Sequence, residues 1–356
     1  MKNWLRPIIL FLISMGALGA VVMISGLIPI SASSGHWPVT AWILEFSMKR
    51  SVSTYTMTKE SPHLEDQRMI QRGAGHYEIG CKQCHGGVEK TNIIGLHTTP
   101  KIPHLPPVIK EWKPEELFRI VKHGVKFTGM PAWPSLQRDD EVWSMVAFLL
   151  QFPKLDQKSY QNLVHAPGSE KIEHDVLRSC SHCHGLDGNG RQTGAFPLLS
   201  GQNAEYLENS LKAYAKGERH SGTMKIVTYN LESEMLKELA LHYSKQKRRP
   251  LVKESVDQSA IEEGSRLARI GIPEQHVASC IGCHGPDERG LTPKPYFPDL
   301  RGQPADYITT QLDLFLKRKR GGSEHVQLMH KAVHTLTALQ IKNLALYFES
   351  LEFKNE

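Results

Sequence analysis

The chain has 356 residues, six cysteines and a formal net charge of +6. This length allows two or three domains, each large enough to bury a core of its own. The basic balance is no argument for nucleic acid, because no RNA- or DNA-binding motif accompanies it and bound acidic cofactors would offset it.

The N-terminal segment is predicted to be a membrane anchor over residues 1–34. Lys2 and Arg6 precede an uncharged run over residues 8–30. A spanning helix needs about 20 apolar residues, whereas the apolar core of a cleavable signal has roughly 7–15. The cations place the N-terminus in the cytoplasm and the rest of the chain outside. The alternative is a long signal peptide that is cut near Ala32.

Residues 35–63 are predicted to form a short interfacial helix and a tether. Trp37, Trp42 and Phe46 suit a helix that lies at the level of the lipid headgroups. The alternative is a helix that packs on the domain that follows. Residues 51–61 are polar and rich in Ser and Thr, so they are predicted to be the tether.

A five-residue pattern, Cys-x-x-Cys-His, occurs three times, with 99 and 100 residues between the first cysteines. It is the attachment signature of c-type haem, in which two thiols bind the porphyrin and the adjacent histidine binds the iron. Zinc half-sites or thioredoxin-like motifs are the alternative, but three halves do not pair evenly. We therefore expect three covalently attached haem c groups, held by Cys81, Cys84 and His85, by Cys180, Cys183 and His184, and by Cys280, Cys283 and His284.

The helix predicted around residues 67–80 delivers the first motif, and Gly73 on it permits close approach of another helix. The second and third motifs open an internal duplication. Phe-Pro-x-Leu-x-Gly-Gln occurs at residues 196–202 and again at 297–303, and each copy is followed four residues later by a tyrosine. These tyrosines, Tyr206 and Tyr307, are predicted to hydrogen-bond within or across the two copies.

A methionine in a loop before each closing helix is the predicted sixth ligand of each iron. Met130 lies 45 residues after its motif histidine, Met224 lies 40 and Met329 lies 45. A haem with His and Met ligands is closed and carries one electron, whereas a haem with His alone has an open iron face. The matching distances favour closed sites. The rival sixth ligands are His123, His220, His330 and His334.

Three prolines and two arginines are predicted to support the haem sites. Pro103, Pro197 and Pro298 are each expected to place a backbone carbonyl on the second ring nitrogen of a motif histidine. Ordinary loop rigidity is the alternative. Arg219 and Arg301 are candidates to pair with haem propionates. The basic run over residues 317–320 is expected to be a solvated loop, with the hypothesis that it steers an acidic redox partner.

The residues from Pro167 to Leu351 resemble the two-haem cytochrome c4 family. The resemblance rests on the repeated Phe-Pro-x-Leu-x-Gly-Gln motif, on the tyrosine after it and on the methionine before each closing helix. The first haem region resembles a single class I cytochrome c. Together these resemblances imply an all-α fold with three class I cytochrome c domains in tandem, over residues 64–155, 167–250 and 251–356. They also imply a face-to-face pairing of the last two domains.

The predicted function is single-electron transfer by a membrane-anchored cytochrome at the bacterial inner membrane, with its haem domains in the periplasm. No residue is assigned to bond-making chemistry, so we expect an electron carrier and not an enzyme. The expected donors are a quinol-oxidising complex or a periplasmic dehydrogenase, and the expected acceptors are a terminal oxidase or a soluble carrier. Two alternatives stay open: a cytochrome subunit of a membrane-bound dehydrogenase or oxidase, and a peroxidase-like enzyme with one open iron.

Overall fold

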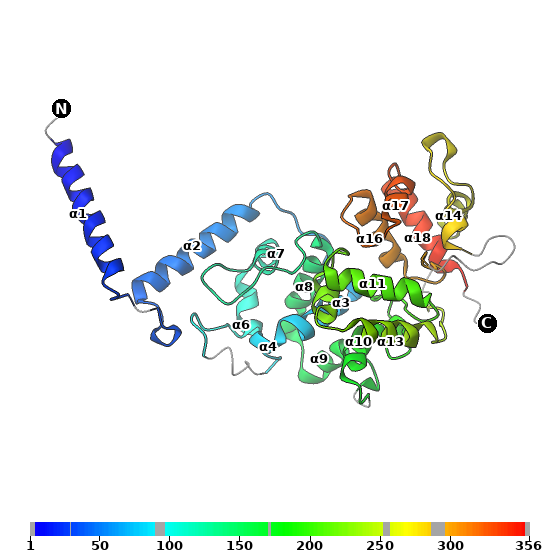
Figure 1. The fold of residues 1–356 in the computed structure, drawn as a ribbon, viewed down its shortest axis with the longest axis horizontal. Helices are drawn as coiled ribbons and strands as arrows, with labels where there is room; N and C mark the ends of the chain where they lie inside the picture. The colour runs from blue at the N-terminus through cyan, green and yellow to red at the C-terminus, as the bar shows by residue number, and fades with distance from the viewer. Residues whose placement is uncertain are drawn as a thin grey trace.

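The fold is helical throughout the part of the chain that the structure, a computed structural model, describes (Figure 1). No strand occurs among these residues, and a single isolated bridge joins Ile272 to Val277. The predicted all-α class is therefore confirmed for them. They are residues 4–28, 30–89, 97–169, 172–251, 257–285 and 296–352.

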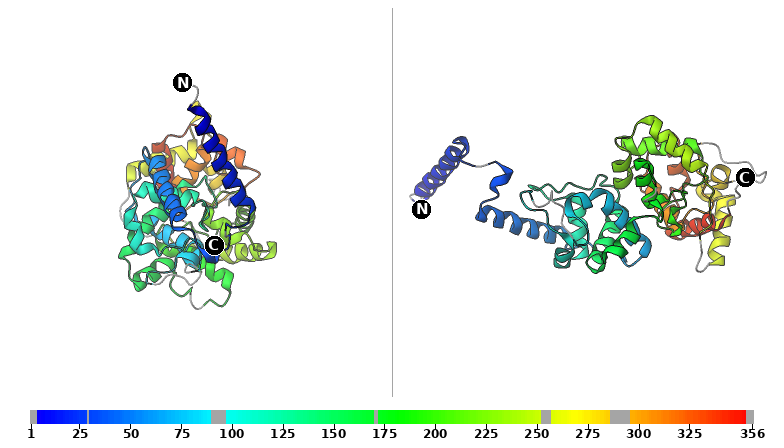
Figure 2. Two further views of the ribbon diagram at one scale, coloured as in Figure 1. Left: turned by 90° about the vertical axis from the view of Figure 1, so that its left-hand side faces the viewer. Right: turned by 90° about the horizontal axis from the view of Figure 1, so that it is seen from below.

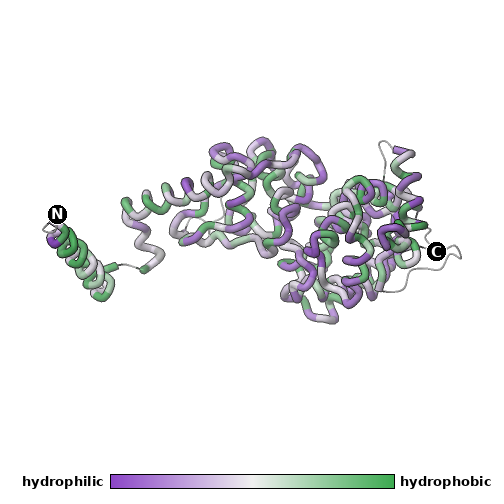
Figure 3. Tube along the Cα trace, turned by 90° about the horizontal axis from the view of Figure 1, so that it is seen from above, coloured by the Kyte–Doolittle hydropathy of each residue, from purple (hydrophilic) through white to green (hydrophobic). Residues whose placement is uncertain are grey.

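Helix α1 (Leu5–Ile24) stands apart from the rest of the molecule and consists mostly of apolar residues (Figure 3). It has 20 residues, its most apolar 18-residue stretch has a mean hydropathy of 2.5, and none of that stretch is buried. Among the described residues it is the one helix long and apolar enough to cross a membrane, by length and composition alone. An N-terminal signal sequence meets the same test, so the structure leaves both predicted alternatives in place.

Helix α2 (Pro38–Thr56) is longer than the sequence predicted, because residues 51–56 are helical and the polar tether begins only after them. The helix packs on α7, Val52 in its later turns is buried, and the Arg119 guanidinium of α7 lies 4.0 Å from the centroid of the Tyr55 ring. Its first turns are exposed, with Trp42 and Phe46 stacked at 5.6 Å. The predicted packing on the first haem region thus holds for the second half of the helix.

The first group of helices is built on the crossing of α3 (Gln67–Gly80) and α8 (Asp139–Gln151). A Cβ on Gly73 would lie 2.0 Å from the carbonyl oxygen of Ser144, so the predicted role of this glycine is confirmed. The core takes in Tyr160 and so extends beyond residue 155, where the sequence predicted this domain to end. The other elements of the group are α4 (Lys82–His85), α6 (Leu105–Val108), η2 (Ile109–Glu111), α7 (Pro114–His123), η3 (Phe152–Lys154) and α9 (Gln157–Val164).

The last group repeats this crossing with α14 (Gln258–Ile270) and α18 (Ala338–Ser350). A Cβ on Gly264 would lie 2.1 Å from the carbonyl oxygen of Asn343. The two outer groups therefore use a glycine in the same way to bring two helix backbones together. The other elements are η6 (Pro273–Gln275), α15 (Ile281–His284), α16 (Ala305–Leu316) and α17 (Val326–Ala332).

The middle group is assembled differently, because the described residues show no comparable crossing between its first and last helices. Its last helix packs on α11, and α3 of the first group lies against α10 and α12. At this contact a Cβ on Gly75 would lie 2.9 Å from the Sγ atom of Cys183. The first and middle groups therefore adjoin through α3 (Figure 2). The helices of the middle group are α10 (Asp175–His184), α11 (Ala204–Lys216), α12 (Gly222–Thr228) and α13 (Ser233–Ser244).

Candidate haem sites

Each motif histidine is the last residue of a helix, and its ring is held by the carbonyl oxygen of a proline. The carbonyl accepts only, so the Nδ1 atom must carry the proton and Nε2 keeps a free lone pair. This is the tautomer that an iron ligand requires, and the prediction for the three prolines is confirmed. The Nδ1–O distances are 3.0 Å for His85 and Pro103, 3.3 Å for His184 and Pro197, and 3.0 Å for His284 and Pro298.

The same three imidazoles are kept neutral by their surroundings. Burial lowers the pKa of His85, of His184 and of His284, and the hydrogen bond to the proline carbonyl only partly opposes this. A neutral ring is the form that binds a metal. The geometry and the protonation state of the proximal side therefore both fit a haem iron.

The motif cysteines lie beside these histidines, and no disulfide joins them. Burial raises the pKa of Cys81 and Cys183 to about 12 and that of Cys180 and Cys280 to about 11. A thiol with a raised pKa is a poor thiolate nucleophile, which does not suit a thioredoxin-like role. Among the described residues no cluster of three or more His, Cys, Asp or Glu side chains could hold a metal ion without haem.

The structure places the predicted methionine ligands in two kinds of position: Met130 is in a loop as predicted, whereas Met224 and Met329 lie on the short helices α12 and α17 and not in loops. The Sδ atom of Met329 lies 3.4 Å from Nε2 of His284, so these two side chains face each other across the third site. Met224 and His184 line one cavity, at the start of α12 and the end of α10. Met130 lies in the loop after α7, where its carbonyl accepts from the backbone N–H of Val125 at 3.2 Å.

The rival histidines have other environments. His330 is buried, but its Nε2 atom lies 3.0 Å from the carbonyl oxygen of Arg320 and not at the face of His284. His334 is exposed, and its Nδ1 atom lies 2.7 Å from the Lys331 carbonyl oxygen. His123 is also exposed. His330, the nearest rival in the sequence, therefore does not face the third site in the structure.

The repeated Phe-Pro-x-Leu-x-Gly-Gln segments form a reciprocal contact between the middle and last groups. Gln202 donates to the carbonyl of Asp299 at 3.0 Å and accepts from its N–H at 2.9 Å. Gln303 does the same with Leu198, at 2.6 and 3.0 Å. All four residues are buried. Each copy of the motif thus pairs with the backbone of the other copy in a pseudo-twofold arrangement, a role that sequence reasoning missed.

The second and third sites open into one cavity of about 570 Å³ that is lined by both motif histidines and by Met224 and Met329. This shared lining supports the expected face-to-face pairing of the two copies. The cavity is bordered on a third side by residues of α3, among them His76. Burial lowers the pKa of His76 to about 4.

Two buried arginines, Arg219 on the lining of this cavity and Arg320 near its tyrosines, have no carboxylate partner among the described residues. The Arg219 guanidinium donates to the hydroxyl of Tyr206 at 3.4 Å and to the hydroxyl of Tyr307, in the last group, at 3.1 Å. Its Nε atom has no hydrogen-bond partner among the described residues. Arg320 donates to Gln311 at 2.7 Å. Unpaired buried guanidinium groups call for an anion, and the propionates of a haem supply one. The chemistry of the cavity therefore fits haem.

The pKa of Tyr206 reflects the positive charge of these arginines, whereas burial raises the pKa of Tyr307 to about 12. Burial raises the pKa of Tyr206, but the guanidinium groups of Arg219 and Arg320 outweigh it and lower the pKa to about 8. The cluster confirms the predicted hydrogen bonding of Tyr206 and Tyr307. It also corrects the expectation for the basic run over residues 317–320, because Arg320 is buried at the join and is not part of a solvated loop. Arg301, the other propionate candidate, pairs with Asp299.

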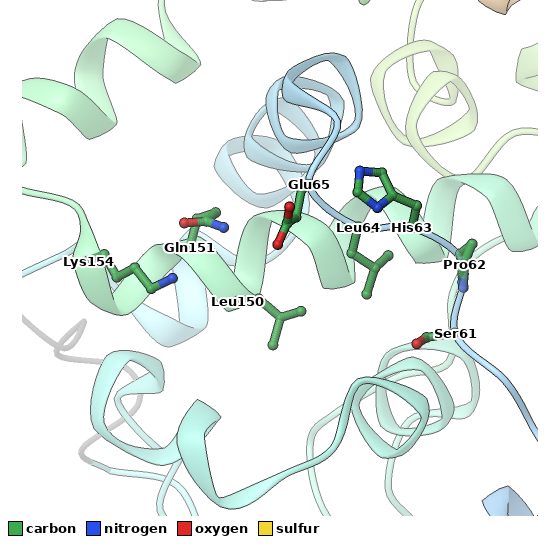
Figure 4. A pocket seen from close by; sticks show the side chains of 8 residues that line it. All are labelled: Ser61, Pro62, His63, Leu64, Glu65, Leu150, Gln151 and Lys154. Carbon is green, nitrogen blue, oxygen red and sulfur yellow. The ribbon is translucent and has the colours of Figure 1, made fainter.

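A second, shallower pocket lies where the chain enters α3 and is lined in part by Leu64, Glu65 and Leu150 (Figure 4). None of its eight lining residues belongs to a Cys-x-x-Cys-His motif or is a predicted sixth ligand. The haem chemistry therefore lies elsewhere.

Comparison with known proteins matches two separate parts of the chain to cytochrome families. Residues 68–149 match the family "Cytochrome C oxidase, cbb3-type, subunit III", and residues 274–352 match the family "Cytochrome c". The "Thiosulfate dehydrogenase electron acceptor" of Thiomonas intermedia is 33% identical over 180 residues, which cover 51% of this chain and 82% of that protein. Cytochrome c4 of Azotobacter vinelandii is 31% identical over 198 residues, which cover 53% of this chain and 92% of that protein.

Among solved structures, reduced recombinant cytochrome c4 from Pseudomonas stutzeri has a TM-score of 0.45 and 28% identity, covering 52% of this chain and 97% of that one. Helical groups that carry Cys-x-x-Cys-His motifs, with histidines in the tautomer of an iron ligand, define a c-type cytochrome that transfers electrons. The chain belongs to the cytochrome c4 family, and the similarity covers about half of its length.

Proposed function

We propose that this chain is a membrane-anchored cytochrome with three haems that carries single electrons in the periplasm. The observation that carries the proposal is the repetition of one proximal arrangement at three motifs, each with a histidine ring oriented by a proline carbonyl. Electron transfer through relayed sites needs no further catalytic side chain. We therefore propose a carrier and not an enzyme.

The residues that would hold the three groups are those of the motifs, together with one methionine for each. The haems supply one-electron chemistry when bound. The chain supplies the anchoring thiols, the neutral imidazoles and, in our proposal, the thioether ligands Met130, Met224 and Met329, which favour the ferrous state. Arg219 and Arg320 would neutralise propionates inside the shared cavity.

The placement of the chain at the inner membrane is part of the proposal. It is supported by the length and composition of α1 and by the exposed aromatic side chains at the start of α2. An uncleaved α1 would hold the haem groups at the periplasmic face. Extraction of the mature protein only by detergent, with Lys2 to Ile24 detected in it, supports the anchor, whereas release without detergent indicates a cleaved signal.

The proposed partners are redox proteins on either side of the chain. The relative named as an electron acceptor of thiosulfate dehydrogenase favours a periplasmic dehydrogenase as donor. A quinol-oxidising complex is the other proposed donor, and a terminal oxidase or a soluble carrier is the proposed acceptor. A stable place within such a complex is favoured by the uncovered aromatic half of α2, and co-purification from detergent extracts separates that subunit role from a free carrier.

The haem count and the ligands are tested by spectroscopy of the full-length protein. A pyridine haemochrome assay should give three haems per chain, and any other number refutes the proposal. The oxidised protein should show the weak methionine–iron band near the red edge of the visible spectrum. M130A, M224A and M329A should each remove about one third of that band, since each site contributes one methionine. Substantial carbon monoxide binding by the reduced wild-type protein indicates an open iron and favours a peroxidase-like enzyme.

A further inference from the structure

Glu141 lies in the first turn of α8, but its carboxylate reaches the middle group. The side chain is 5% exposed, and it accepts two hydrogen bonds from the segment that carries Met224. The hydroxyl of Ser221 donates to Oε1 at 2.6 Å, and the backbone N–H of Gly222 donates to Oε2 at 2.6 Å. The same hydroxyl accepts from the N–H of Met224 at 3.1 Å as the N-cap of α12. One serine oxygen therefore links Glu141 to the backbone of the proposed ligand.

The same carboxylate also binds the ligand loop of the first haem region. The indole Nε1–H of Trp133 donates to Oε2 of Glu141 at 3.1 Å. Trp133 lies three residues after Met130, and its backbone N–H donates to the carbonyl of Lys122 at 3.0 Å. The Gly129–Trp133 loop is thus attached to the neighbouring helix and to Glu141 at once.

The Gly129–Trp133 loop and the start of α12 also touch directly. A Cβ on Gly222 would lie 2.2 Å from Nε1 of Trp133, so the indole occupies the space that a larger residue would need. His76 of α3 adds a contact from its Nδ1 atom to the hydroxyl of Thr223. The start of α12 at the second site is therefore covered by side chains of the first group.

The charge of the buried Glu141 carboxylate is balanced by Arg138, at the contact between the first and middle groups. Nη1 of Arg138 lies 3.0 Å from Oε1 of Glu141 and also donates to the carbonyl of His220 at 2.9 Å. Asp140 forms an ion pair with Nη2 of the same guanidinium. A buried carboxylate that accepts from three donors and pairs with an arginine is a satisfied site, and removing it leaves those donors without acceptors.

We infer that Glu141 is a positioning residue that couples the Met130 loop of the first haem site to the start of α12, which carries Met224 of the second. The inference rests on the proposed function, since it takes Met130 and Met224 as iron ligands. It goes beyond that function because the first group then helps to determine whether the second iron keeps its methionine.

Substitution in the full-length protein tests this coupling. In E141Q one carboxylate oxygen becomes an amide NH₂, which opposes either the N–H groups of Gly222 and Trp133 or the guanidinium of Arg138. S221A removes the hydroxyl that bonds Oε1 of Glu141 and caps α12, but it leaves the bonds from Gly222 and Trp133 to Oε2 in place. We expect S221A to reduce the methionine–iron band by up to about one third and E141Q by up to about two thirds, because E141Q weakens the contacts to both the Met130 loop and the start of α12. Carbon monoxide binding by the reduced protein should rise in the same order.

Controls separate positioning from unfolding. E234Q changes a glutamate in the first turn of another closing helix, α13, and should leave the band unchanged. Haem content and helical circular dichroism should stay at wild-type values in S221A, and E141D should recover part of the band. An unchanged band in both S221A and E141Q, alongside the loss of one third in M224A, overturns the coupling alone. An unchanged band in M224A overturns the proposed ligand itself, and with it the coupling.

Discussion

Replacing Gln303 by alanine should destabilise the join between the middle and last groups. Gln303 is 3% exposed and Leu198 is 1% exposed, and two hydrogen bonds of 2.6 and 3.0 Å connect them. The substitution leaves a buried carbonyl and a buried N–H without partners. Each such loss costs roughly 1–3 kcal/mol, so we expect the join to lose about 3 kcal/mol.

The pseudo-twofold arrangement provides a built-in comparison. Gln202 makes the equivalent pair of hydrogen bonds with the backbone of Asp299, so Q202A should cost about the same as Q303A. The double variant should cost less than the sum of the two, because both pairs hold the same interface. Q327A, at an exposed position on α17, is the matched control.

The measurement is denaturant unfolding of the haem-loaded protein, followed by visible absorbance. A chain with several cores does not unfold in two states, so midpoints of the four variants are compared and not extrapolated free energies. Q303A and Q202A midpoints that coincide with that of Q327A refute the reasoning about the join. A large shift in only one of the two refutes the pseudo-twofold arrangement.

Three further outcomes follow from the structure. M329A should abolish methionine ligation at the third site while H330A leaves the methionine–iron band intact, and the reverse pattern makes His330 the ligand. G264A places a Cβ 2.1 Å from the backbone of α18 and should lower stability by about 1–3 kcal/mol, whereas G87A, with nothing within 4 Å of its Cβ, should not. Burial lowers the pKa of His76 from 6.5 to about 4, so the unfolded chain binds the proton first as the pH falls. The free energy of unfolding should therefore fall by about 3 kcal/mol as the pH is lowered from about 6.5 to about 4. The unfolding midpoint of H76Q should show little of this decrease.

The histidine side of each haem site could be predicted from sequence because the residues that form it lie close together along the chain. The motif histidine and its proline lie only 13 to 18 residues apart along the chain. The role of Gly73 was likewise visible, since a glycine on an amphipathic helix suggests a close crossing. Spacing along the chain was sufficient for these predictions, and the structure confirmed them.

What sequence reasoning missed depends on contacts between distant segments. Glu141 is an acid in the first turn of a helix, which on its own predicts only a favourable interaction with the helix dipole. Its hydrogen-bond partner Ser221 lies 80 residues away. Arg320 follows three other basic residues, and a run of like charge suggests solvent, yet its own side chain is buried. The last turns of α2 pack against α7 and bury Val52, which the polar composition of residues 51–56 did not reveal.

The middle group is joined to its two neighbours by different chemistry, and this difference bears on function. Its join to the last group uses side-chain amides and backbone groups at a repeated motif, with Gln202 and Gln303 in equivalent places. Its join to the first group is centred on a charged side chain, Glu141, which contacts the segment of Met224 itself. A remote contact would only tether two electron carriers. A contact at the start of α12, beside Met224, makes the second site sensitive to the first group, which α2 connects to the proposed membrane anchor.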